Sequence, residues 1–113
     1  MIDIIPELRK AFSDEGMELI PEDAADSSVQ FPCITYRESE NTDASVGDNM
    51  GYSSIAYSIQ IWSYSMSEIS VLSGKIDMLM KKYKFTRFMG DIQTVDGLHR
   101  KILGYRKIIK ESF

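Results

Sequence analysis

The chain is poor in the residues from which most catalytic and metal centres are built. It has one histidine, His99, and one cysteine, Cys33, among 113 residues. A structural zinc site takes about four Cys or His ligands, and a disulfide framework needs paired cysteines. The lone cysteine fits a reducing compartment and is expected to be a buried structural thiol. We therefore expect no cofactor, no metal and no catalytic residues, so the sequence predicts that the protein is not an enzyme.

Other familiar signatures are also missing. We find no Gly-rich phosphate loop, no nucleophile elbow and no zinc-protease motif. No apolar run approaches the roughly 20 residues that span a bilayer. The first residues show neither the basic region nor the long apolar stretch of a secretory signal. With 43% hydrophobic and 27% charged residues, the sequence predicts a single globular domain over residues 1–113 and no membrane partner.

Charge is unevenly distributed along the chain. Residues 1–50 carry twelve acidic and three basic residues, a net charge of −9, whereas residues 51–113 carry five acidic and ten basic residues, a net charge of +5. A chain polarised in this way can bind a copy of itself, acidic surface to basic surface, or bind nucleic acid through its basic half.

Two segments carry apolar side chains at helical spacing. The first is residues 2–15, which Gly16 is suited to end. The second follows Ser65 and Glu68, a capping box in which the Ser65 hydroxyl accepts from the Glu68 N–H and the Glu68 carboxylate reaches back to the Ser65 N–H. The apolar stripes of the two helices are Ile4, Ile5, Leu8, Ala11 and Phe12, and Ile69, Leu72, Ile76, Leu79, Met80 and Tyr83.

Extended segments are expected at 33–39 and 52–63. In the second, Ile55, Tyr57, Ile59 and Ile61 alternate with smaller or polar residues, which predicts a strand with that set facing the core. Between the two strands, residues 40–51 show no periodicity, and we expect a long mobile loop there.

The last 29 residues are typical of a hairpin with its turn at Asp96-Gly97. In a regular hairpin Phe88 faces Tyr105 and Arg87 faces Arg106. Because two arginines repel each other, either an acid lies between them or a bulge near Gly90 shifts the register.

This element order predicts an α+β fold. The expected architecture is a four-stranded, mostly antiparallel sheet with two helices packed on it, in the order α-β-β-α-β-β. Trp62 has three alternative roles. It can lie in the core beneath the adjacent helix, anchor a protein interface, or join Tyr52 and Tyr64 in stacking nucleic-acid bases.

Five stretches together resemble a known family. They are Phe-Pro-Cys-Ile-Thr-Tyr at 31–36, a central strand ending in Ile-Gln-Ile-Trp-Ser at 57–63, Ile-Asp at 76–77, Lys-Phe-Thr-Arg at 84–87, and Asp-Gly-Leu-His-Arg-Lys-Ile-Leu at 96–103. In this order the chain resembles the tail-terminator, or tail-completion, proteins of long-tailed (siphovirus-like) bacteriophages. The likeness covers nearly the whole chain.

The resemblance implies a structural assembly protein of the virion, found in the tail or neck and assembled in the host cytoplasm. Such proteins form rings, expected to be hexameric, that cap the tail tube and join it to the head. The implied partners are copies of the chain itself, a tail tube protein and a neck or head-completion protein, while DNA only passes through the lumen. A head–tail neck adaptor of similar fold and a small nucleic-acid-binding module are the alternatives.

Two sets of residues are candidates for such a role. We expect subunit or partner contacts from aromatic and basic residues of the second half, and a channel lining from acidic residues in and before the expected loop. The interface candidates are Trp62, Tyr64, Arg87, Arg100, Lys101 and Arg106, and the channel candidates are Glu38, Glu40, Asp43 and Asp48.

Overall fold

A computed structural model describes residues 4–26, 28–46 and 50–112, with side chains described for 4–26, 28–40 and 54–109. The elements follow in the order α1 (Ile5–Asp14), β1 (Leu19–Pro21), a 3-10 turn η1 (Glu22–Ala24), β2 (Cys33–Val46), β3 (Met50–Ser63), α2 (Met66–Lys82), β4 (Thr86–Val95) and β5 (Leu98–Ser112). The molecule is elongated, with extents of 53 × 26 × 25 Å.

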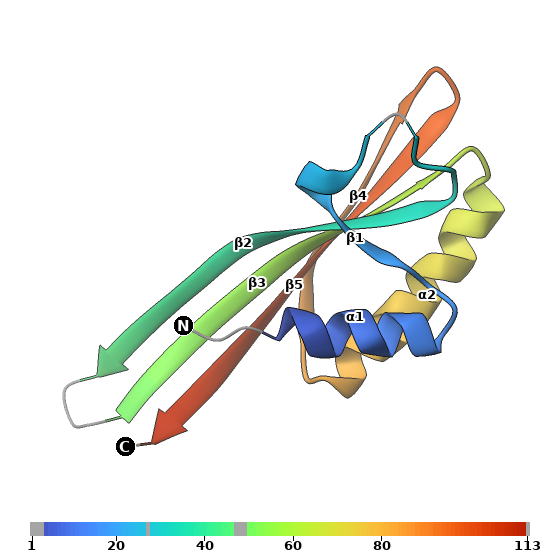
Figure 1. The fold of residues 1–113 in the computed structure, drawn as a ribbon. Helices are drawn as coiled ribbons and strands as arrows, with labels where there is room; N and C mark the ends of the chain where they lie inside the picture. The colour runs from blue at the N-terminus through green and yellow to red at the C-terminus, as the bar shows by residue number, and fades with distance from the viewer. Residues whose placement is uncertain (1–3, 27, 47–49, 113) are drawn as a thin grey trace.

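The fold is α+β, but the expected four-stranded sheet is wrong. The five strands form one mixed sheet in the order β1-β2-β3-β5-β4 (Figure 1). The additional strand, β1, runs parallel to β2 and pairs Leu19 with Ile34 and Pro21 with Tyr36. Its three residues are too few to show a strand periodicity, so only pairing with β2 defines them as a strand.

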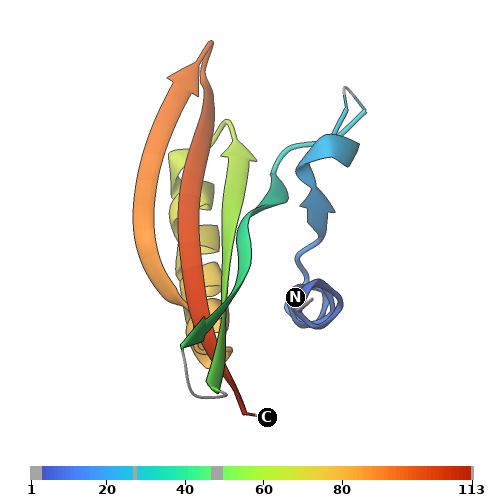
Figure 2. The same cartoon turned by 90° about the vertical axis from the view of Figure 1, so that its left-hand side faces the viewer.

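Most of the expected loop over residues 40–51 is also strand, although residues 47–49 lie outside the described residues. β2 continues to Val46, and β3 pairs with it from Met50 to Trp62. Together with the end of β5, these strands form a three-stranded arm that extends beyond the helices (Figures 1 and 2). Backbone hydrogen bonds between the strands stabilise this segment, and the periodicity of the side chains does not indicate them.

Both helices pack on one face of the sheet. That face carries Ile55, Tyr57, Ile59 and Ile61 of β3, each at most 1% exposed, as the alternation predicts. Against it pack the apolar stripes of α1 and α2, with Ile4, Leu8, Phe12, Ile69, Ile76, Leu79 and Met80 all buried. Neither helix in the described part of the chain is long and apolar enough to cross a bilayer.

The start of α2 follows only half of the predicted capping box. The Ser65 hydroxyl accepts from the Glu68 N–H at 3.2 Å, as expected. The Glu68 carboxylate, however, accepts from the Ser63 hydroxyl at 2.6 Å, and the same Ser63 oxygen accepts from the Ser65 N–H at 3.0 Å. Ser63 therefore serves as a relay between the end of β3 and the helix.

The β4–β5 hairpin has the predicted turn, with Val95 opposite Leu98. Its register shifts between Arg87 and Met89, so the bulge lies at Phe88, close to the expected place. Arg87 consequently faces Tyr105 and pairs with Asp77 of α2 at 3.0 Å. The bulge therefore places Arg87 and Arg106 on opposite faces of the sheet, with no need of an acid between them, and the expected Phe88–Tyr105 pair does not form.

Candidate functional site

The face of the sheet that points away from the helices carries a buried chain of polar side chains. Trp62 Nε1 donates to Thr35 Oγ1 at 3.0 Å, and Thr35 Oγ1 donates to Gln60 Oε1 at 2.6 Å. Gln60 Nε2 then donates to Ser58 Oγ at 2.7 Å. Thr35 and Gln60 are only 2% and 1% exposed, so this face of β2 and β3 is part of the folded interior. We call these four residues the polar chain.

Trp62 lies on this helix-free face rather than beneath α2. It is half-buried, and the Arg100 guanidinium lies 4.9 Å from the centre of its ring. Trp62 also lines a hollow of about 250 Å³ with Phe31, Cys33 and the segment between η1 and β2, which we call the connector and which contributes Ala25, Asp26 and Val29. Because the Arg100 guanidinium lies against the indole, Trp62 is not a free platform for a nucleic-acid base.

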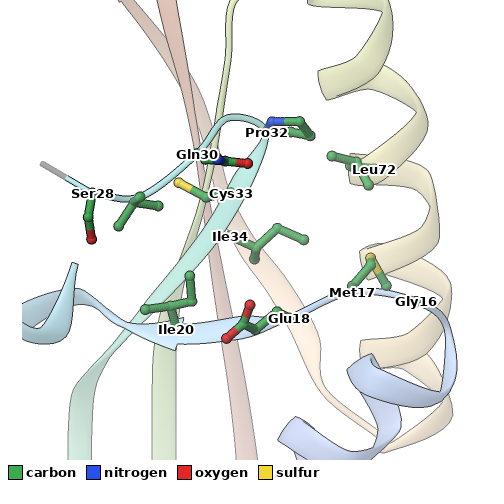
Figure 3. A pocket seen from close by; sticks show the side chains of 11 residues that line it. Gly16, Met17, Glu18, Ile20, Ser28, Gln30, Pro32, Cys33, Ile34 and Leu72 are labelled. Carbon is green, nitrogen blue, oxygen red and sulfur yellow. The ribbon is translucent and has the colours of Figure 1, made fainter. Parts of the chain in front are cut away.

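A second hollow, of about 450 Å³, lies between β1, the connector and the start of β2 (Figure 3). The Cys33 sulfur points toward the connector side of this hollow, and the Glu18 carboxylate lies on the β1 side. Burial raises the pKa of the Cys33 thiol, which disfavours the reactive thiolate. His99 pairs with Ser63 and lies on the helix side of the sheet, whereas Cys33 pairs with Trp62 on the opposite face. The Nδ1 atom of His99 is 2.7 Å from Thr94 Oγ1, so the imidazole is not directed at the thiol.

The described residues contain no cluster of three or more His, Cys, Asp or Glu side chains that could hold a metal. The pKa of Tyr105 is raised well above its usual value by burial and by its hydrogen bond to Asp77. Tyr105 packs in the core beneath α2, so its protonated hydroxyl ties the sheet to the helix rather than facing a cleft.

The predicted interface residues do not form one patch. Trp62 and Arg100 stack on the helix-free face near β1, and Arg106 lies on the same face farther along β5, 4.7 Å from the Phe88 ring. Tyr64 is 62% exposed and contacts Phe31 edge-on, at 5.6 Å between ring centres. The register places the two remaining candidates, Arg87 and Lys101, on the helix side of the sheet.

The predicted channel residues are likewise divided. A register shift between Glu38 and Glu40 sets them opposite Tyr57 and Ala56, on different faces of the sheet. Glu40 pairs with Arg106 at 3.2 Å. Asp43 belongs to β2, opposite Ser53, but its side chain lies outside the described residues, as does the whole of Asp48.

Charge complementarity is partly satisfied within the chain. Besides the Glu40–Arg106 pair, Glu22 lies 3.8 Å from Arg37 and 3.9 Å from Arg100. The Glu40–Arg106 and Glu22–Arg100 pairs connect the acidic first half to the basic second half across the helix-free face, whereas Glu22–Arg37 lies within the first half. The charge asymmetry of the sequence therefore contributes to this fold as well as to any contact between copies.

An exposed apolar cluster, not foreseen from the sequence, lies around Arg106. Phe88 is 50% exposed, Met89 40% and Ile108 65%. Ile108 follows two residues after Arg106 on the same face of β5, and with Phe88 it lines a hollow of about 380 Å³ beside Lys84 and Lys107. We call Phe88, Met89, Arg106 and Ile108 the outer patch. In the sequence, this patch is indicated only by the two large apolar residues Phe88 and Met89 in an otherwise mainly polar strand.

Comparison with known proteins does not assign the chain to a family. No family model matches the chain, and no curated protein matches it.

Proposed function

We propose that the protein is a structural assembly protein whose copies join into a closed, hexameric ring. In the form suggested by the resemblance, this ring caps the tail tube of a long-tailed phage and connects it to the neck of the head. The proposal includes the absence of catalysis, because the proposed action of the ring is to hold two larger assemblies together.

The observation that carries the proposal is the outer patch. Large apolar residues exposed side by side, next to an arginine, are typical of protein interfaces, where aromatic residues, Met and Arg are enriched. The patch lies on the helix-free face, at the base of the three-stranded arm. A ring requires such a surface, since one patch of each copy must meet a different patch of the next.

The structure offers less support for a nucleic-acid-binding module. Arg87, Arg100 and Arg106 each lie within 4.0 Å of a carboxylate, and the Trp62 ring is covered by Arg100. Phosphate contacts draw their affinity from basic side chains available to release counterions. Here those side chains are already partly neutralised.

Mass measured in solution over a range of concentrations tests the proposal, with Ile108→Glu as the disrupting variant. We expect a ring-sized species for the unmodified chain and at least a tenfold weaker assembly for Ile108→Glu. Val71→Glu is the matched control, since Val71 is 59% exposed on α2 and far in sequence from the patch; it should assemble normally. A strict monomer that binds oligonucleotides tightly at physiological salt would favour the nucleic-acid alternative instead.

A further inference from the structure

The sheet ends in two open strand edges of equal length. β4, with ten residues, is the last strand on one side. On the other side β1 pairs only with Ile34–Tyr36, which leaves the ten residues Arg37–Val46 of β2 at the edge of the sheet in the described part of the chain. An open edge presents backbone N–H and C=O groups that can pair with another strand.

The outward groups of β4 can be identified. In a hairpin with a two-residue turn, Val95 and Leu98 exchange backbone hydrogen bonds, so every second residue from Val95 bonds to β5 and the intervening ones point outward. The Ile92 N–H fits this pattern, because it donates to the Asp91 carboxylate at 2.8 Å rather than to β5. Asp91 thus occupies one edge donor in the isolated chain, in the manner of edges that are protected until they pair.

We propose that β4 of one copy pairs with residues 37–46 of β2 in the next copy, so that the sheet continues from subunit to subunit. This inference rests on the ring proposed above and specifies its junction. β2 and β5 both run antiparallel to β3, and β4 runs antiparallel to β5. In a cyclic ring each copy keeps its direction along the axis, so β4 meets the neighbouring β2 antiparallel.

Two conditions select the register between β4 and the neighbouring β2: residues paired across the junction must lie on the same face of the sheet, and β4 must not overlap β1. Arg37 pairs with Ser58 and lies on the helix-free face, as does Val95, which is opposite Leu98 two residues before Arg100. Placing Val95 opposite Arg37 and Thr94 opposite Glu38 keeps the helices of both copies on one side. Beyond the register shift at Ser39, the same face matching sets Glu40 opposite Gln93. This register also makes the neighbouring strand end beside Pro21, the last residue of β1, so β1 acts as a stop.

The resulting stagger is physically reasonable. Within one copy, Thr94 pairs with His99, and His99 pairs with Ser63 of β3. In the next copy, the proposed partner of Thr94 is Glu38, which pairs with Tyr57 of β3. The shift is therefore six residues per copy. Six residues of about 3.3 Å over four strand spacings of about 4.8 Å give a strand tilt of about 45°, at the upper end of the range for closed sheets.

Charge favours the same partner. Residues 37–46 carry three acids and one base, a net charge of −2, and the hairpin from 86 to 107 carries five bases and two acids, a net charge of +3. The edge strand β4 itself, residues 86–95, carries one base and one acid, a net charge of zero. The acidic β2 edge therefore meets no net like charge on β4, whereas two β2 edges would repel each other.

Disulfide trapping tests the register. In a Cys33→Ser background, Arg37→Cys combined with Val95→Cys should cross-link copies into a ladder that stops at the ring size. Within one copy the two positions lie three strand spacings apart, about 14 Å, and are also offset by six residues, about 20 Å, along the strands. They are therefore beyond the reach of a disulfide. The control combines Arg37→Cys with Gln93→Cys, which shifts the thiol by about 7 Å along the same strand. It should cross-link at least tenfold more slowly.

Two backbone variants provide a second measurement. Ile92→Pro removes an outward N–H and spares the β4–β5 pairing, so it should weaken assembly at least tenfold, whereas Ile92→Ala, which keeps the N–H, should assemble normally. If rings form but neither measurement distinguishes its pair of variants, the edge pairing is wrong and the ring proposal stands. If the unmodified chain stays monomeric and neither cysteine pair cross-links copies, both proposals fail.

Discussion

Replacing Thr35 with valine tests whether the polar chain stabilises the fold. Valine keeps the shape of threonine but removes the hydroxyl that accepts from Trp62 Nε1 at 3.0 Å and donates to Gln60 Oε1 at 2.6 Å. Gln60 is 1% exposed, so water cannot replace the lost donor without opening the face. Trp62 is half-buried and recovers part of its loss from solvent.

The expected cost follows from these burial differences. A buried acceptor left without a partner costs about 1–3 kcal/mol, and the half-exposed indole N–H adds a smaller amount. We expect Thr35→Val to lower the free energy of unfolding by about 2 kcal/mol. For a chain of this size that corresponds to roughly 10 °C in melting temperature.

The assay is urea unfolding followed by the fluorescence of Trp62, the only tryptophan of the chain. Adding Gln60→Leu completes a double-mutant cycle. When both partners are apolar neither is left unsatisfied, so the double variant should be more stable than the sum of the single losses predicts, by about 1–2 kcal/mol. A cost for Thr35→Val below about 0.5 kcal/mol, or a cycle that is additive within that error, would refute this reasoning.

Three further predictions concern stability. The pKa of Tyr105 is raised in the folded chain, so above the pKa of an unfolded tyrosine, about 10, the hydroxyl ionises first in the unfolded state. The free energy of unfolding should therefore fall by about 1.4 kcal/mol per pH unit above that pH because of this group. Tyr105→Phe should reduce this slope when urea unfolding is measured at a series of pH values. At Gly104 an added Cβ would lie 2.9 Å from the Phe88 ring and 3.2 Å from Met89 Cβ; Gly104→Ala should cost about 1–2 kcal/mol in urea unfolding, and unchanged stability would mean that Phe88 moves freely. Ser65→Ala removes the N-cap of α2 and should cost about 1 kcal/mol by the same measurement, with an exposed Ser67→Ala, inside the first turn, as the near-neutral control.

The sequence predicted best where one rule acts on neighbouring residues. Helical spacing located both helices, alternation located the core face of β3, and the Asp96-Gly97 signal located the turn. The repulsion expected between Arg87 and Arg106 required a bulge or an acid between them, and the structure has the bulge. These features depend on contacts within a few residues or across one hairpin.

Prediction failed where the partner lies far away in the chain. β1 is a strand only because β2 lies beside it, and residues 40–46 extend because β3 pairs with them. The roles of the candidate site residues stay predictions, and residue spacing did not indicate how the fold groups them. A register shift beside Ser39 separates Glu38 from Glu40, and residue spacing alone could not indicate it.

The helix-free face links the polar chain, the internal ion pairs and the proposed junction. A sheet face without helices would ordinarily leave Ser58 and Gln60 in water, yet both are buried. η1, the connector and Arg100 lie on that end of the face, around Thr35 and Trp62. β1, which leads into η1, pairs with β2 only as far as Tyr36 and leaves the rest of β2 at the edge of the sheet. A neighbouring β4 would extend the sheet from that edge.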